Sequence, residues 1–213
     1  MTSFSNRSRV RNIFLVLLSA SSFLFLSSCN VLEIAGPPPD LYNLTPKSTF
    51  SADLPEVPWQ LIIEEPIAAG GLDTNRIALR PHATELKFFA GARWTERAPK
   101  MIQTLLVESF ENTNKIIAVG RQSIGLRADF TLKTELREFQ SETINDNDVI
   151  TVRVRINAKI VKQPKRIIVG SRSFEHVVQV KEGNGIHNIV LAFDAAAGNV
   201  LKHLVEWSLV TLK

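Results

Sequence analysis

Hydrophobic residues are distributed along this chain in three different ways. An apolar run interrupted only by Ser and Ala covers residues 13–26. Short apolar or alternating runs fill much of the centre. Two segments, 98–110 and 188–207, repeat apolar residues every three or four positions. Alternation is typical of a half-buried strand and the longer period of an amphipathic helix, so we expect a leader, several strands and two helices.

The longest alternating runs are residues 130–139 and 150–160. In the second run Val152, Val154 and Ile156 alternate with polar residues. The segment between the two runs contains Asn145–Asp148, whose residue types favour a turn. These features predict an antiparallel hairpin with one polar face.

Shorter strands and the loops between them account for most of the remaining chain. The polar segment 47–58, which contains two prolines, is expected to be a loop, and Gly170 is a candidate bulge in the last strand. A hairpin is expected across Pro81-His82. The predicted short strands are residues 41–44, 59–65, 77–80, 86–89, 116–119 and 167–180.

The two helical segments decide the fold class. The first is expected from Ala98 to Phe110, with Pro99 in its first turn and Thr95 as its cap. The second is expected from Asn188, as its cap, to Trp207. Strands, a helix, more strands and a final helix predict a single α+β domain: a mainly antiparallel sheet with two helices packed on one face.

The N-terminal apolar run has the layout of an export signal. Arg7, Arg9 and Arg11 precede it, and its 14 residues are fewer than the about 20 that span a bilayer. The run ends in Leu26-Ser27-Ser28-Cys29, which resembles the bacterial lipoprotein signal, although Gly or Ala is commoner at the position of Ser28. The alternative is a plain signal peptide or an uncleaved anchor with a chance cysteine.

The resemblance to a lipoprotein signal implies what happens at Cys29. Its sulfur would receive a diacylglycerol, the signal would be cleaved before it, and its new amino group would be acylated, with chains such as palmitate. The expected organisation is therefore a signal peptide at 1–28, a lipidated Pro-rich linker at 29–40 and a domain at 41–213. The linker reaches at most about 45 Å, which keeps the domain close to its membrane.

Composition excludes some partners. The apolar fraction of 45% and the charged fraction of 22% are those of a globular protein. Removing the leader removes three arginines, so the net charge of +4 falls to about +1, which gives no support for a nucleic-acid partner. Cys29 is the only cysteine, so no disulfide is expected once it is lipidated.

Motifs that would indicate an enzyme or a metal site are absent from the sequence. It has no phosphate-binding loop, and Gly120–Gly125 is one residue too long for a nucleophile elbow. The four histidines are scattered, and the segment at Asp146 and Asp148 lacks the later glycine and glutamate of a calcium loop. We therefore expect no catalysis, no metal and no cofactor besides the covalent lipid.

One small basic turn, with Lys162, Lys165 and Arg166, has two possible interpretations. It is either a solvated turn, which is the commoner case, or a contact to lipid headgroups.

Several stretches in a fixed order carry a resemblance to a known family. After the lipoprotein signal come Tyr42-Asn43-Leu44, then residues 89–94 before the first helix, and then residues 192–207 in the last. In this the chain resembles the ABC-type transport auxiliary lipoproteins, the PqiC-like family. The resemblance implies a Gram-negative transport system for lipids or other hydrophobic compounds, with a permease, an ATPase and an MCE (mammalian cell entry) domain protein as partners.

By the same resemblance, Tyr42, Leu44, Arg93 and Trp94 match the family pattern and are candidate partner contacts. The alternative is structural, with Trp94 packed under the first helix and Arg93 bonded to the sheet edge. Asn30 follows the lipidated cysteine where Asp would signal retention in the inner membrane, so the outer membrane, facing the periplasm, is expected.

Two other functions stay open at this point. A structural or assembly lipoprotein of the envelope would share every feature except the transport partners. A secreted hydrolase is disfavoured because the sequence shows no nucleophile and base in a recognisable pattern. A homo-oligomer is possible in either of the lipoprotein interpretations.

Overall fold

The computed structural model describes residues 37–122, 127–144, 149–181, 183 and 185–212, and residues from Pro39 onward form one compact unit. Cys29 and the predicted loop 145–148 lie outside the described residues. The strands are β1 (Asp40–Tyr42), β2 (Val57–Ile63), β3 (Ile67–Ala68), β4 (Arg76–Arg80), β5 (Lys87–Trp94), β6 (Ile116–Gly120), β7 (Phe130–Ile144), β8 (Val149–Lys162) and β9 (Ile167–Gln179), and the helices are α2 (Ala98–Glu111) and α3 (Ile186–Thr211).

Strand β7 organises the sheet, which has nine strands in the described residues. Along one side it pairs over its whole length with β8, which in turn pairs with β9, and both pairings are antiparallel. Along the other side it pairs in succession with β2, β3 and β4, each in parallel. The long antiparallel pairs confirm the predicted fold class and hairpin, whereas the short parallel pairs were not predicted.

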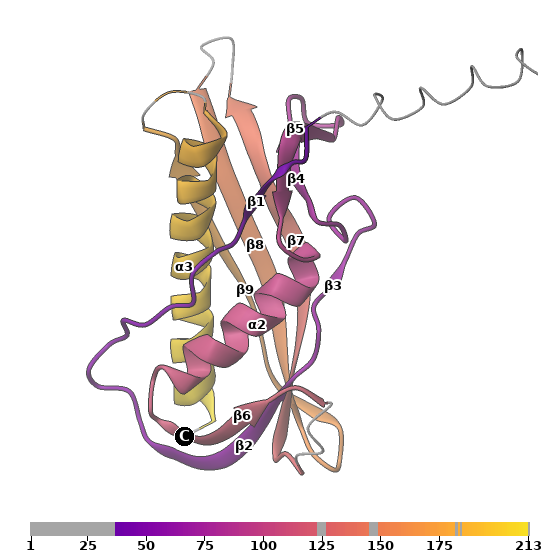
Figure 1. Cartoon of the computed structure of the whole chain (residues 1–213). Coiled ribbons are helices and arrows are strands. Elements are labelled where there is room, and N and C mark those ends of the chain that lie inside the picture. Colours follow the sequence, from indigo (N-terminus) through magenta and orange to yellow (C-terminus); the bar gives the residue numbers. More distant parts are fainter. Residues whose placement is uncertain (1–36, 123–126, 145–148, 182, 184, 213) are drawn as a thin grey trace, which may run out of the picture. The chain divides into compact units, whose positions relative to one another are not determined.

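Both helices pack on one face of the sheet (Figure 1). Helix α3 contacts β8 and β9, and α2 contacts β2, β6 and α3. The alternating apolar residues of β8 from Val152 to Ile160 are buried, as are Ile189, Phe193 and Leu204 of α3. Full burial of such a side chain contributes about 1.5–3 kcal/mol, so this face holds most of the core. Neither described helix is long and apolar enough to cross a bilayer.

The helix ends differ from the sequence-based expectation. Helix α2 is capped by Arg97 without a side-chain bond, and α3 by Gly185. Thr95 instead donates its backbone N–H to the carbonyl of Tyr42 at 2.9 Å, and Asn188 lies in the first turn of α3. Both capping predictions are therefore wrong, because Arg97 and Gly185 occupy the N-cap positions.

A β-bulge changes which side chains of β7 face the core. Leu136 pairs with Ile156 and Glu138 with Arg155, so Arg137 is an extra residue without a partner. Before the bulge Leu136 points inward, and after it Phe139 does. The bulge therefore places Glu138 on the outer face of the sheet, away from the helices.

The segment between β1 and β2, residues 43–56, is bonded to α3, and we call it the strap. Thr45 donates its backbone N–H and its hydroxyl to the Asp194 carboxylate at 2.7 and 2.9 Å. Ser51 donates in the same way to Glu206 Oε1, with both distances at 2.9 Å. Both acceptors lie on α3, so these bonds fasten the segment that follows the linker to the C-terminal helix.

Candidate functional site: exposed edge, polar network and groove

Strand β1 lies at an edge of the sheet. It pairs in parallel with β5 alone, with Leu41 opposite Arg93 and Tyr42 opposite Trp94. Its other side carries no strand in the described part of the chain. The edge position agrees with the sequence-based expectation, although the strand ends at Tyr42 rather than at Leu44. The backbone groups on its free side can pair with another chain.

Two of the four predicted contact residues belong to the core. Trp94 is fully buried, with its ring centroid 5.6 Å from that of Phe139 and 5.2 Å from that of Phe193. Leu44 is only 3% exposed. Burial of both side chains favours the structural alternative for them over contact with a partner.

The other two predicted residues remain accessible. Arg93 is exposed, and its Nη1 donates to Asn75 Oδ1 at 3.3 Å, which is a long and weak bond. Tyr42 is half-buried, and its neighbour Leu41 is 64% exposed. We call Leu41, Tyr42, Asn43 and Arg93 the β1 edge. It combines free backbone groups, one large apolar side chain and one cation.

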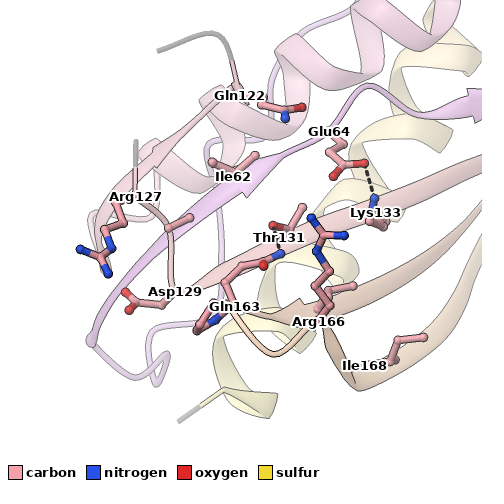
Figure 2. Close-up of a pocket in the computed structure, with 13 residues that line it drawn as sticks. Ile62, Glu64, Gln122, Arg127, Asp129, Thr131, Lys133, Gln163, Arg166 and Ile168 are labelled. Atoms are coloured by element: carbon pink, nitrogen blue, oxygen red, sulfur yellow. Dashed lines mark hydrogen bonds and ion pairs between the residues drawn. The ribbon is translucent and has the colours of Figure 1, made fainter. Parts of the chain in front are cut away.

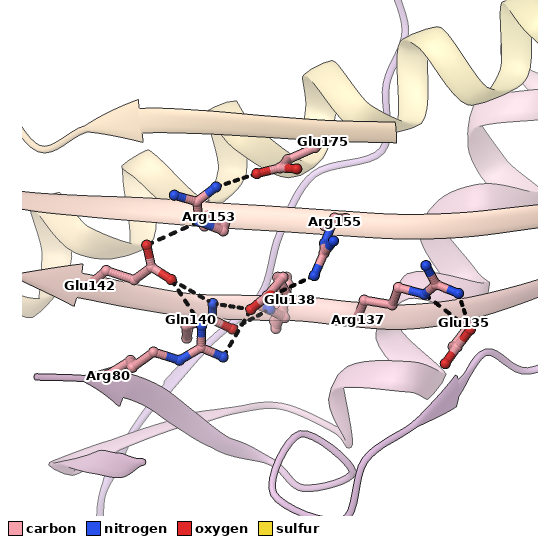
Figure 3. A network of polar contacts seen from close by, with 10 residues as sticks. Arg80, Glu135, Arg137, Glu138, Gln140, Glu142, Arg153, Arg155 and Glu175 are labelled. Carbon is pink, nitrogen blue, oxygen red and sulfur yellow. Dashed lines mark hydrogen bonds and ion pairs between the residues drawn. The ribbon is translucent and has the colours of Figure 1, made fainter. Parts of the chain in front are cut away.

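The outer face of β7 and β8 carries a polar network, shown in Figure 3. Glu138 accepts bonds from Arg80 Nη2 at 2.9 Å, Arg155 Nη2 at 2.7 Å and Gln140 Nε2 at 2.6 Å. Glu142 accepts from Arg80 Nη1 at 3.3 Å and from Gln140 Nε2 at 2.9 Å. Only 13% of the Glu138 side chain and 14% of the Glu142 side chain are exposed.

Opposite charges are matched within this network. Arg153 donates to Glu142 Oε2 at 3.0 Å and also pairs with Glu175 on β9. Burial by itself would raise the pKa of Glu138, but hydrogen bonds from Gln140 and Arg155 and the nearby arginine charges outweigh it, so the pKa is lowered. The network joins β4, β7, β8 and β9. Its carboxylates are occupied by these contacts, which indicates a structural role.

A groove of about 920 Å³ lies at the start of β7, next to the turn between β8 and β9 (Figure 2). The predicted basic turn forms part of its wall through Arg166, whereas Lys162 and Lys165 do not line it. Segments from β2, β7 and β9 meet here, and such a meeting of distant segments was not predicted. The lining residues with apolar or charged side chains include Ile62, Val161, Ile168, Arg127, Lys133, Arg166, Glu64 and Asp129.

Among the described residues, no group of three or more His, Cys, Asp or Glu side chains is arranged to hold a metal ion. The candidate surfaces are the β1 edge, the polar network and the groove.

The sequence model of the ABC-type transport auxiliary lipoprotein components matches residues 42–205. The chain belongs to this family. The matched segment runs from the end of β1 into α3, so it covers nearly the whole described domain of this auxiliary lipoprotein, and the resemblance expected from the sequence is confirmed. Family membership associates the protein with an ABC transport system of the cell envelope.

Two solved structures share the fold of the auxiliary lipoprotein. The crystal structure of a Xanthomonas campestris protein has 31% sequence identity and a TM-score of 0.76, and the match covers 81% of this chain and 95% of that one. An uncharacterised protein with 12% identity has a TM-score of 0.62, covering 81% and 99% of the two chains. At that identity the second match shows the fold alone.

A curated relative is longer than this chain. An uncharacterised protein of Bradyrhizobium diazoefficiens is 29% identical over 154 residues, which is 71% of this chain and 40% of that protein. The auxiliary lipoprotein thus spans less than half of this relative's length.

Proposed function

We propose that the protein is a non-enzymatic, periplasm-facing lipoprotein of an ABC/MCE-type transport system for lipids or other hydrophobic compounds. Cys29 carries the lipid, and Asn30 directs the protein to the outer membrane. The β1 edge docks the MCE protein of the system. The observation that carries the docking proposal is the unpaired side of β1, directly after the linker.

The β1 edge has the chemistry that an extended partner segment requires. Added strands gain main-chain hydrogen bonds from an open sheet edge, and flanking side chains supply specificity. Leu41 offers exposed apolar area to a partner. Arg93 makes one long hydrogen bond to Asn75, which a partner could replace at little cost. Because the strap holds Thr45 to Asp194, the chain leaves β1 in a fixed direction and the edge is preorganised.

The lipid anchor supports this proposal through geometry. With a linker reach of at most about 45 Å, a protein anchored at Cys29 keeps the β1 edge near the membrane surface. Multiple acyl chains on one residue make the anchor stable, whereas a single chain anchors only marginally. Cys29→Ala is expected to abolish labelling by a fatty-acid probe and to leave an unprocessed precursor. Undiminished labelling of this variant would show that Cys29 is not the lipidated residue.

Crosslinking in cells tests the docking surface. A photoreactive amino acid at the exposed positions 41 and 43 should give adducts with the MCE protein. The matched control is position 191, since Leu191 is similarly exposed at 54% but lies on α3. Adducts with transport components from position 191 and none from positions 41 and 43 would place the docking surface elsewhere.

The second candidate function is a structural or assembly lipoprotein of the envelope. The charge-matched network on the outer sheet face is compatible with it, since that network needs no transport partner. The two functions differ in the proteins that accompany the lipoprotein: transport components in the first, and none of them in the second.

A further inference from the structure

Aliphatic side chains contribute to the lining of the groove beside the β8–β9 turn. Val161 and Ile62 form part of it, and Ile168, in the same wall as Arg166, is 56% exposed. Ile168 pairs with Val161 across β8 and β9, so the two side chains lie on the same face of the sheet and form an apolar strip in the groove.

Two arginines at this groove have no partner in the described part of the chain. Neither Arg127 nor Arg166 makes an ion pair or hydrogen bond there, whereas the neighbouring Lys133 pairs with Glu64 at 2.6 Å. The remaining carboxylate, Asp129, accepts the backbone N–H of Gln60 at 2.9 Å through its Oδ2. In Figure 2 Arg166 reaches into the middle of the view, between Gln163 and Lys133, and Arg127 lies at one side.

The backbone at Arg166 adds an independent observation. Its φ is +55°, in the left-handed region that favours glycine. An arginine at such a position strains the turn slightly, and a glycine there would relieve the strain. The Arg166 side chain lines the groove and is exposed to solvent.

We propose that this groove binds an anionic amphiphile, with its acidic head on the Arg166 guanidinium and its acyl chain along Val161 and Ile168. A guanidinium offers paired N–H donors that match a carboxylate or a phosphate. The volume of about 920 Å³ falls within the about 300–1,000 Å³ usual for ligand clefts. The inference rests on the proposed function, since it assigns the class of compound that the transport system would hand over.

Photolabelling of the full-length lipoprotein in isolated membranes tests this proposal. The probe is a long-chain fatty acid with a diazirine on its chain, and its uncharged methyl ester is the comparison. The acid should label the segment that contains Val161 and Ile168, and it should label it more strongly than the ester does. Arg166→Gly should reduce labelling by the acid about tenfold, the usual weight of one charged hydrogen bond. The same variant should keep or raise the melting temperature, because glycine relieves the positive φ.

The matched control is Lys165→Ala, which removes the same charge from the same turn but not from the groove. It should leave the labelling unchanged. If it lowers the labelling as much as Arg166→Gly does, the turn attracts a bilayer surface and the groove proposal is overturned. Equal labelling of wild type and Arg166→Gly, or labelling outside the groove, also overturns it. Co-purification of the Arg166→Gly variant with transport components reports separately on the proposed function.

Discussion

The polar network on the outer sheet face leads to a quantitative prediction for Glu138→Gln. The substitution keeps the shape of the side chain and removes its charge. Bonds from Arg80 and Arg155 then change from charge–charge pairs to bonds with a neutral acceptor. Hydrogen bonds to charged groups contribute about 1.5–3 kcal/mol and neutral ones about 1, so two weakened bonds lower the free energy of unfolding by about 2 kcal/mol.

Urea unfolding of the mature chain, produced without its leader, measures this change. With a denaturant slope of about 2 kcal/mol per M, the midpoint should fall by about 1 M at pH 7. The control is Glu135→Gln, since Glu135 pairs with Arg137 at the surface and half of its side chain is exposed. That variant should lose less than about 0.5 kcal/mol.

The pH dependence separates the charge of Glu138 from its shape. The pKa of Glu138 is lowered in the folded protein, so its stabilising contribution is complete above the unfolded pKa of about 4.3 and is lost as the pH falls through the folded value. The gap between wild type and Glu138→Gln should therefore shrink in acid. Equal midpoints for the two variants at pH 7, or a gap that persists undiminished in acid, would refute the assigned role.

Two further substitutions test the packing that surrounds the surfaces. Gly170→Ala should lower the melting temperature, because a Cβ there would lie 3.0 Å from Trp207 Cζ2, whereas Gly70→Ala, with no atom within 4 Å, should not; equal shifts would contradict the close approach of α3. Asp194→Ala removes the acceptor of two bonds from Thr45 and should cost about 1–3 kcal/mol. Hydrogen exchange should speed up in the strap, and unchanged exchange would show that other contacts hold it.

Local periodicity was sufficient to predict much of this fold. The helix from Ala98 and the β7–β8 hairpin follow from spacing alone, because burial on one side imposes the period. The two cap predictions are wrong because they rest on residue type alone, and the N-caps in the structure are Arg97 and Gly185. In the structure Thr95 bonds to Tyr42, a contact that no local pattern reports.

The bulge in β7 leaves a sign in the sequence pattern. Leu132 and Leu136 are buried at even positions, and Phe139 is buried at an odd one. Such a change of parity within an alternating run is the sequence signal of an extra residue. Glu138, at an even position after the bulge, is thereby placed in the polar network on the outer face.

The groove and the parallel pairs of β7 could not be predicted from local patterns. The groove needs Ile62, Arg127 and Arg166 to meet, and their spacing in the sequence carries no sign of this. The basic residues of the β8–β9 turn were a partial signal, but they did not reveal that Arg166 lines the groove and Lys165 does not. The burial of Trp94 also depends on tertiary contacts, here with Phe139 and Phe193.

The central claim is that this lipoprotein works as a subunit of an envelope transport system through its β1 edge. Affinity purification of the full-length protein from membranes in mild detergent, followed by mass spectrometry, tests it most directly. We predict recovery of an MCE-domain protein together with a permease and an ATPase, and loss of this recovery when Leu41 and Arg93 are both replaced by Asp. Recovery of the lipidated protein without any of these components would contradict the account.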